Sequence, residues 1–252
     1  MESTTKRDGA TRWTSISRPG HRMENTGSEP EPESSIGVYW SRRAPAAALF
    51  FVGPSMPLAA ISDDPPFALS TEGIRHRLKL ATAGAHHALD ERLCQFDLTT
   101  TVHYRRFLQA SAAALLPLEA ALEQAGVAGH IDDWFLRRRS SAIMADLGEL
   151  DGVARPMSLP LARRDRAFIF GTLYVLEGSR LGAAYLLRIV AASADPRVRR
   201  ATRYLRHGAG AGLWQSFLSQ LSREPTTADD EILMMESALD AFALFAGAVA
   251  SA

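Results

Sequence analysis

Hydrophobic and polar positions follow a helical period through nearly all of the chain from Ser70 onward. Apolar residues recur every three to four positions, and the helix-favouring residues Ala, Leu and Arg are abundant there. Runs of β-branched residues that would mark strands are missing. The pattern predicts helices at residues 71–94, 102–125, 131–147, 163–192, 195–206, 210–222 and 227–250. Amphipathic helices with short connections indicate an all-α fold, a compact single-domain bundle in which cofactor sites are built from facing helices.

The first part of the chain has a different composition. Residues 1–69 are rich in Ser, Thr, Pro, Gly, Arg and Glu and show no sustained period, which predicts a disordered N-terminal extension before a helical domain at 70–252. The apolar patch at 46–52 is too short to span a membrane. Because the globular pattern begins so late, we expect translation in the cell to start further along, near Met56.

Composition narrows the function classes. The chain has 252 residues, 46% of them hydrophobic, with 28 basic and 28 acidic residues and a formal net charge of +0. A balanced charge gives no support for a nucleic-acid partner, and no membrane partner is expected. The single cysteine, Cys94, excludes an intramolecular disulfide and a cysteine-based metal cluster, and it is consistent with a cytoplasmic protein.

One face of the first predicted helix carries the first candidate chemistry. Lys79, Thr82, His86 and Asp90 are spaced so that they share this face. A neutral imidazole can bind iron through one ring nitrogen when a partner such as Asp90 accepts the proton on the other. His87 points about 100° away and cannot face the same pocket. The alternative is that both histidines are ordinary surface or core residues.

The helix predicted at 163–192 carries two glycines one turn apart, Gly178 and Gly182. Each costs about 1 kcal/mol relative to alanine in a helix interior, so the pair needs a structural reason. Together with Ser179 and Ala183 they leave a stretch of helix almost without side chains, against which a flat ligand can lie. The alternative is close packing of two helices through small residues.

These two segments together resemble the heme oxygenase family, and more closely its bacterial branch, which includes iron-acquisition enzymes and those encoded beside bacteriophytochromes. The resemblance spans roughly residues 74–250. Its specific parts are Leu78-Lys79, Ala81-Thr82 and His86 in the first segment, and Tyr174 with Glu177-Gly178-Ser179, Leu181-Gly182 and Ala183-Ala184 in the second.

The resemblance implies a role for each matching residue, with heme held between a proximal and a distal helix. His86 would be the metal ligand and Asp90 its hydrogen-bond partner. Gly178, Ser179 and Gly182 would form the catalytic surface over the oxygen site. The implied heme-binding set is Lys79, Thr82, His86, Asp90, Tyr174, Gly178, Ser179, Gly182 and Ala183, in which Lys79 and Tyr174 match positions that contact propionates.

The implied activity is the opening of heme b, both substrate and cofactor, to biliverdin, carbon monoxide and ferrous iron. It uses oxygen and electrons from an external donor such as a ferredoxin, a flavodoxin or a reductase. A non-catalytic heme carrier or sensor on the same fold is the alternative, and a helical interaction protein without cofactor is a third hypothesis. Away from the site, Glu177 is expected to be a structural hydrogen-bond or ion-pair partner. The basic cluster at 137–139 is interpreted as a solvated face or a docking point for an acidic electron carrier.

Overall fold

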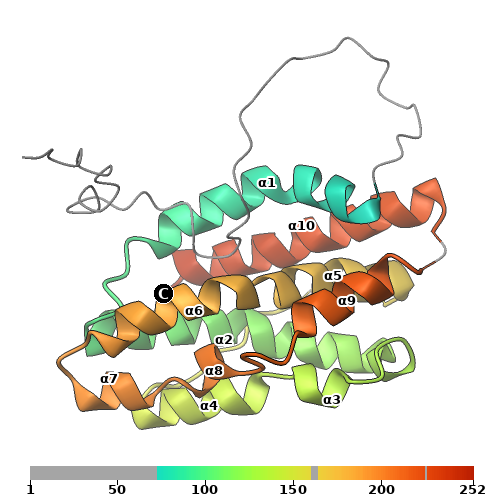
Figure 1. Cartoon of the computed structure of the whole chain (residues 1–252). Coiled ribbons are helices and arrows are strands. Elements are labelled where there is room, and N and C mark those ends of the chain that lie inside the picture. The colour runs from blue at the N-terminus through green and yellow to red at the C-terminus, as the bar shows by residue number, and fades with distance from the viewer. Residues whose placement is uncertain (1–72, 160–163, 225) are drawn as a thin grey trace, which may run out of the picture. The chain divides into compact units, whose positions relative to one another are not determined.

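The computed structural model describes residues 73–159, 164–224 and 226–252, and every regular element in these ranges is a helix (Figure 1). The elements are α1 (Ile74–Leu93), α2 (Thr101–Gln124), the 3₁₀ turn η1 (Val127–Gly129), α3 (Trp134–Arg137), α4 (Ser140–Glu149), α5 (Arg166–Gly178), α6 (Arg180–Ala191), α7 (Pro196–Arg200), α8 (Arg203–Arg206), α9 (Leu213–Leu221) and α10 (Ala228–Ala250). The all-α prediction is confirmed. The predicted disordered extension at 1–69 and the proposed start at Met56 lie outside the described residues.

Helix α10 is the central element on which α1, α2 and α5 pack. Its length and apolar composition would allow it to cross a membrane, but one of its faces is buried in the bundle. The apolar residues of that face are Met234, Ala238, Ala241, Phe242, Phe245 and Ala248, whereas Ile232 and Leu239 are exposed. Arg77 pairs with Glu231 near the first turns of α1 and α10, and Arg92 donates to the Ala246 carbonyl near their ends. The two helices therefore run in the same direction.

Helix α5 approaches α10 closely enough to require a glycine. A Cβ atom at Gly171 would lie 2.3 Å from the Met234 carbonyl oxygen and 2.8 Å from the Ser237 Cβ. At the start of α5, Arg166 lies 3.5 Å from Asp230, so α5 also runs parallel to α10. Helices α1 and α5 thus share α10 as a base and run in the same direction, as Figure 1 shows.

Two predicted helices are interrupted by carboxylates from other helices. The segment predicted as one helix at 131–147 forms two helices, α3 and α4. They are separate because Glu119 of α2 accepts from the Arg139 and Ser140 amides. The segment predicted at 195–206 restarts as α8, because Asp146 of α4 accepts from the Arg203 and Tyr204 amides. In each case a buried carboxylate satisfies the free amides of a helix start.

Candidate active site

The His86 side chain lies on α1 beside a buried carboxylate. Its Nδ1 is 3.3 Å from Asp90 Oδ2, and the two side chains are 16% and 1% exposed. Burial lowers the pKa of His86, and the charge of His87 lowers it further. Burial also raises the pKa of Asp90 to about 7, partly opposed by the charge of His87. The His86 imidazole is therefore neutral at neutral pH, which is the form that binds metals.

His87 faces solvent, as the helical geometry predicts. Its Nε2 lies 3.3 Å from Glu91 Oε1, and these two side chains are 66% and 62% exposed. Two adjacent histidines thus have opposite environments on one helix. His87 provides a natural control for any property that depends on His86.

Thr82 and Tyr174 join α1 to α5 one turn before His86. Both are buried, and the Thr82 hydroxyl donates to the Leu78 carbonyl at 2.7 Å. The Tyr174 hydroxyl makes a hydrogen bond with the Thr82 side chain, and its ring packs 5.7 Å from that of Trp214. Burial raises the pKa of Tyr174 to about 12 despite the opposing effects of the Arg75 charge and this bond. Both predicted residues therefore lie at the contact between the two helices.

This contact sets the register between the two candidate segments. Because α1 and α5 run in the same direction, the next turn of each helix after Thr82 and Tyr174 brings His86 level with Gly178. Gly178 and Gly182 are both buried, whereas Ala183 is partly exposed. The structure thus brings the predicted iron ligand to the same level as the stretch of α5 and α6 without large side chains.

The helix predicted at 163–192 is interrupted at Ser179, between α5 and α6. The Ser179 hydroxyl donates to the Leu176 carbonyl at 2.7 Å, and the Arg139 guanidinium donates to the same carbonyl at 2.8 Å. Arg139 also donates to the Ser179 Oγ at 3.0 Å. Side chains thus take the carbonyl that would otherwise accept from the Arg180 amide, which explains the break.

Behind the break lies a buried ionic network that the sequence analysis missed in part. Arg137 donates to Glu177 at 2.8 Å, to Asp133 and to the Leu213 carbonyl, while Arg180 holds both oxygens of Glu177 at 2.9 Å. The prediction that Glu177 is a structural ion-pair partner is confirmed. A carboxylate within the apolar α5 requires a buried cation as its partner. This requirement could have indicated from the sequence that a residue such as Arg137 is buried.

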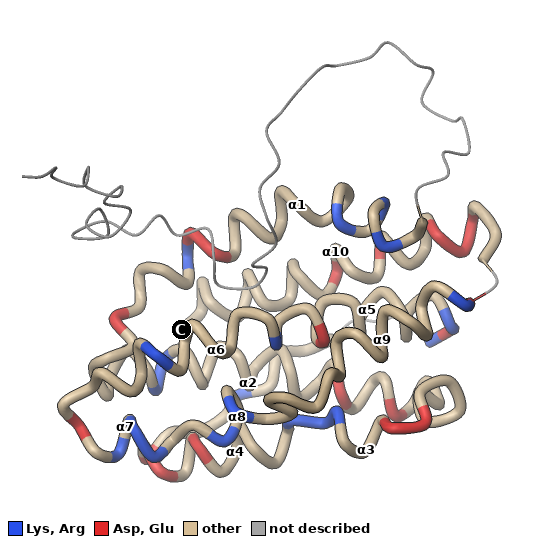
Figure 2. Tube along the Cα trace, in the orientation of Figure 1, with Lys and Arg blue, Asp and Glu red and all other residues tan. Residues whose placement is uncertain are grey.

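The interpretation of 137–139 as a solvated basic cluster is wrong for two of its three residues. Figure 2 shows this basic stretch at the junction of α3 and α4. Arg137 and Arg139 are buried, and only Arg138 faces solvent, with half of its side chain exposed in a pair with Glu123. Helix α3 ends within the cluster, so its three side chains leave in different directions.

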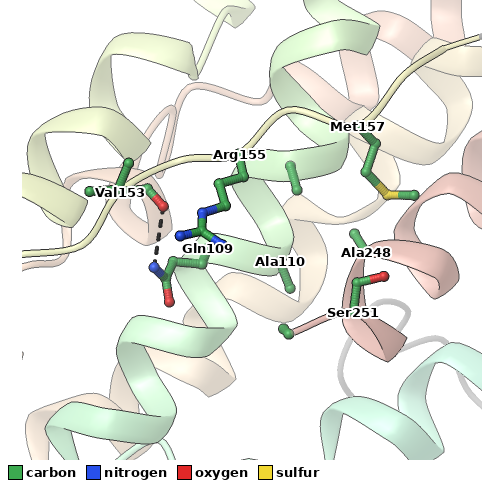
Figure 3. A pocket seen from close by; sticks show the side chains of 9 residues that line it. Gln109, Ala110, Val153, Arg155, Met157, Ala248 and Ser251 are labelled. Carbon is green, nitrogen blue, oxygen red and sulfur yellow. Dashed lines mark hydrogen bonds between the residues drawn. The ribbon is translucent and has the colours of Figure 1, made fainter.

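A separate pocket lies between α2, the segment at 153–157 and the end of α10 (Figure 3). Arg155 and Met157 extend toward it from that segment, and Gln109 of α2 donates to the Val153 carbonyl at 3.2 Å. Its described lining residues include no imidazole and no cysteine. Met157 is the one described lining residue of a type that can ligate heme iron, and the pocket lacks the imidazole on which the candidate site is built.

Comparison with known proteins identifies the family of this chain. The family model described as heme oxygenase matches residues 72–251. The chain belongs to the heme oxygenase family. It is 29% identical over 179 residues to heme oxygenase PigA of Pseudomonas aeruginosa, covering 67% of this chain and 87% of that protein. It also resembles the NO- and CO-bound heme oxygenase from Neisseria meningitidis in fold, with a TM-score of 0.58, 23% identity, and coverage of 73% of this chain and 92% of that one.

These matches confirm three predictions from the sequence: the heme oxygenase family, the all-α fold class and the enzyme class. It supports heme degradation to biliverdin as the activity and does not favour the non-catalytic carrier. The match includes both α1 and the α5 and α6 segments.

Asp90 gives the heme-free protein a testable dependence of stability on pH. Its pKa is raised from 3.8 to about 7, so between these values the native state holds a proton that the unfolded state has lost. This contribution to stability is complete below pH 4 and is lost as pH rises through about 7. The lowered pKa of His86 acts in the opposite sense below pH 6.5.

We therefore expect Asp90→Asn to gain stability relative to the parent protein as pH rises from 4.5 to 8. The change in the free energy of unfolding is on the order of 3 kcal/mol. Urea unfolding at the two pH values measures it. Glu91→Gln, which alters an exposed carboxylate on the same helix, is the matched control. If the free energies of unfolding of the parent and Asp90→Asn differed by the same amount at both pH values, the raised pKa of Asp90 would be contradicted.

Proposed function

We propose that His86 binds the iron of heme b and that the heme lies between α1 and the α5 and α6 segments. The observation that carries this proposal is the shared level of His86 and Gly178. One helix offers a partly buried neutral imidazole, and the other offers backbone without large side chains. Imidazole is a common protein ligand of heme iron, and a flat macrocycle requires a flat surface, so the residues present fit the group.

Lys79 and Tyr174 are proposed to meet the heme propionates. Lys79 is exposed on the first half of α1, where Arg75 and Arg77 also lie, while Asp90 and Glu91 lie toward the other end (Figure 2). Propionate carboxylates are attracted to the basic half, whereas at the other end Arg92 stands beside Asp90 and Glu91 and largely offsets their charge. Thr82 orients the Tyr174 hydroxyl and so defines the side of the site at which a propionate would be received.

Gly178, Ser179, Gly182 and Ala183 are proposed to form the surface on the oxygen side. Bound heme supplies the activation of oxygen, and the protein supplies ligation, orientation and electrostatics. Small residues let the backbone approach closely, and the Arg139 guanidinium that reaches Ser179 is engaged by the Ser179 Oγ and the Leu176 carbonyl. The Ser179 hydroxyl donates its proton to the Leu176 carbonyl and accepts from Arg139, so a water molecule at this surface would have to donate to its remaining lone pair.

The proposed reaction opens heme to biliverdin and releases carbon monoxide and ferrous iron. It consumes oxygen and electrons from an external donor, for which a ferredoxin, a flavodoxin or a reductase is the expected class. We propose that the protein acts in the cytoplasm, where such donors are reduced and where a single cysteine, exposed at Cys94, is ordinary.

The test is an absorption time course of the purified protein mixed with hemin and then given ascorbate in air, with catalase present to remove free peroxide. We expect a Soret band of histidine-ligated heme, followed by its loss and the growth of a broad biliverdin band at long wavelength. A stable Soret band with ascorbate and with a reductase partner would favour the carrier. A failure to bind heme would contradict both heme functions.

A further inference from the structure

The His86 ring contacts an aromatic ring from the central helix. Phe242 of α10 lies with its ring centroid 5.9 Å from that of His86, and the planes of the two rings cross at 79°. Phe242 is 2% exposed, so its own ring is enclosed by the core. This edge-to-face arrangement is one of the favoured geometries of aromatic pairs. Phe242 is not part of the set of site residues predicted from the sequence.

The two helices that carry this ring pair are held together on both sides of it. Arg77 pairs with Glu231 before His86 along α1, and Arg92 donates to the Ala246 carbonyl after it. Both contacts join α1 to α10. His86 and Phe242 thus lie on a stretch over which α1 packs along α10, between two contacts that join these helices.

Asp90 holds the imidazole less firmly than a short hydrogen bond would. Its Oδ2 lies 3.3 Å from His86 Nδ1, beyond the usual length of a charge-assisted hydrogen bond. Its Oδ1 is buried and accepts no hydrogen bond from any described residue. The Phe242 ring restricts rotation of the imidazole about its Cβ–Cγ bond, because such rotation would disturb the 79° edge-to-face arrangement of two packed rings.

We infer that Phe242 is a positioning residue that sets the plane of the His86 imidazole, and through it the orientation of the proximal ligand at the heme iron. This inference rests on the proposed role of His86 as that ligand. The groups that orient a metal ligand also tune the metal. The plane of an axial imidazole determines how the iron d orbitals split and therefore how unpaired electron density is distributed over the porphyrin.

The first experiment tests the ring contact in the heme-free protein. The carbon-bound ring protons of His86, assigned by comparison with His86→Ala, should show a ring-current shift in the NMR spectrum of the parent protein. Phe242→Leu and Phe242→Met remove the ring and should move these resonances to the positions found in an unstructured histidine peptide. Phe242→Tyr retains the ring and should keep the shift.

The second experiment tests the consequence for the ligand. The electron paramagnetic resonance spectrum of the ferric heme complex with azide should show g values that change and broaden in Phe242→Leu and Phe242→Met. Phe242→Tyr should restore the parent g values. Phe245→Leu is the matched control, because Phe245 is another buried ring on the same helix, 4% exposed, and should leave the g values unchanged.

Parent-like His86 resonances and g values in both ringless variants would overturn the inference, as would equal g changes in Phe245→Leu. A merely structural role for Phe242 predicts lower thermal stability without altered g values. Failure of the proposed function has a different signature, since the parent protein itself would then show no histidine-ligated heme. The resonances of the heme-free protein test the ring contact in that case too.

Discussion

Replacing His86 with Ala should abolish the histidine-ligated absorption spectrum of the heme complex and lower biliverdin formation more than about 100-fold. Loss of groups that merely support a metal ligand already costs about 10–100-fold, and removal of the ligand costs at least as much. His87→Ala should leave spectrum and turnover nearly unchanged, because the His87 ring faces solvent beside Glu91. The measurement is a hemin titration followed through the Soret band, and then the ascorbate time course.

Two controls separate ligation from folding. Thermal unfolding of the heme-free His86→Ala protein should remain cooperative, because the imidazole makes a small part of the core around α1 and α10. Added imidazole should enter the space left by the side chain and restore a nitrogen-ligated spectrum. If His87→Ala abolished ligation and His86→Ala did not, the assignment of His86 as the iron ligand would be wrong.

Replacing Gly171 with Ala should destabilise the protein by about 3 kcal/mol or more, the upper range for forcing an extra methyl into a packed core. The new Cβ would lie 2.3 Å from the Met234 carbonyl oxygen, and backbone cannot move aside as the end of a flexible side chain can. Relief of the clash requires α5 and α10 to separate. We expect a large fall in the urea midpoint, followed by circular dichroism of the heme-free protein.

Gly84→Ala is the matched substitution in α1. Gly84 is exposed, and a Cβ there meets nothing within 4 Å. Removal of a glycine from a helix interior should therefore stabilise the protein by about 1 kcal/mol. The two variants add the same methyl group with opposite expected signs. A Gly171→Ala protein as stable as the parent would show that α5 does not pack on α10 as closely as described.

The contacts of the candidate site within α1 could be predicted from the sequence, but its contact with α10 could not. His86 and Asp90 were paired from helical spacing alone, and the structure places them 3.3 Å apart. The opposite environment of His87 followed from the same geometry. Phe242 was not among the predicted site residues, because nothing in the sequence tells which residue of α10 lies against which residue of α1. That register depends on contacts between residues far apart in the chain, such as Arg77 with Glu231.

By itself the sequence determined the local features of this protein: the all-α class, the positions of its longer helices, the shared face of His86 and Asp90, and the small-residue stretch around Gly178. These follow from the backbone period and from the propensities of nearby residues. Only the tertiary structure decided where the helices predicted at 131–147, 163–192 and 195–206 are interrupted. Glu119 and Asp146 end helical runs on other elements, and Arg139 does so at Ser179, because a buried carboxylate or guanidinium competes for backbone groups that the helix would otherwise pair.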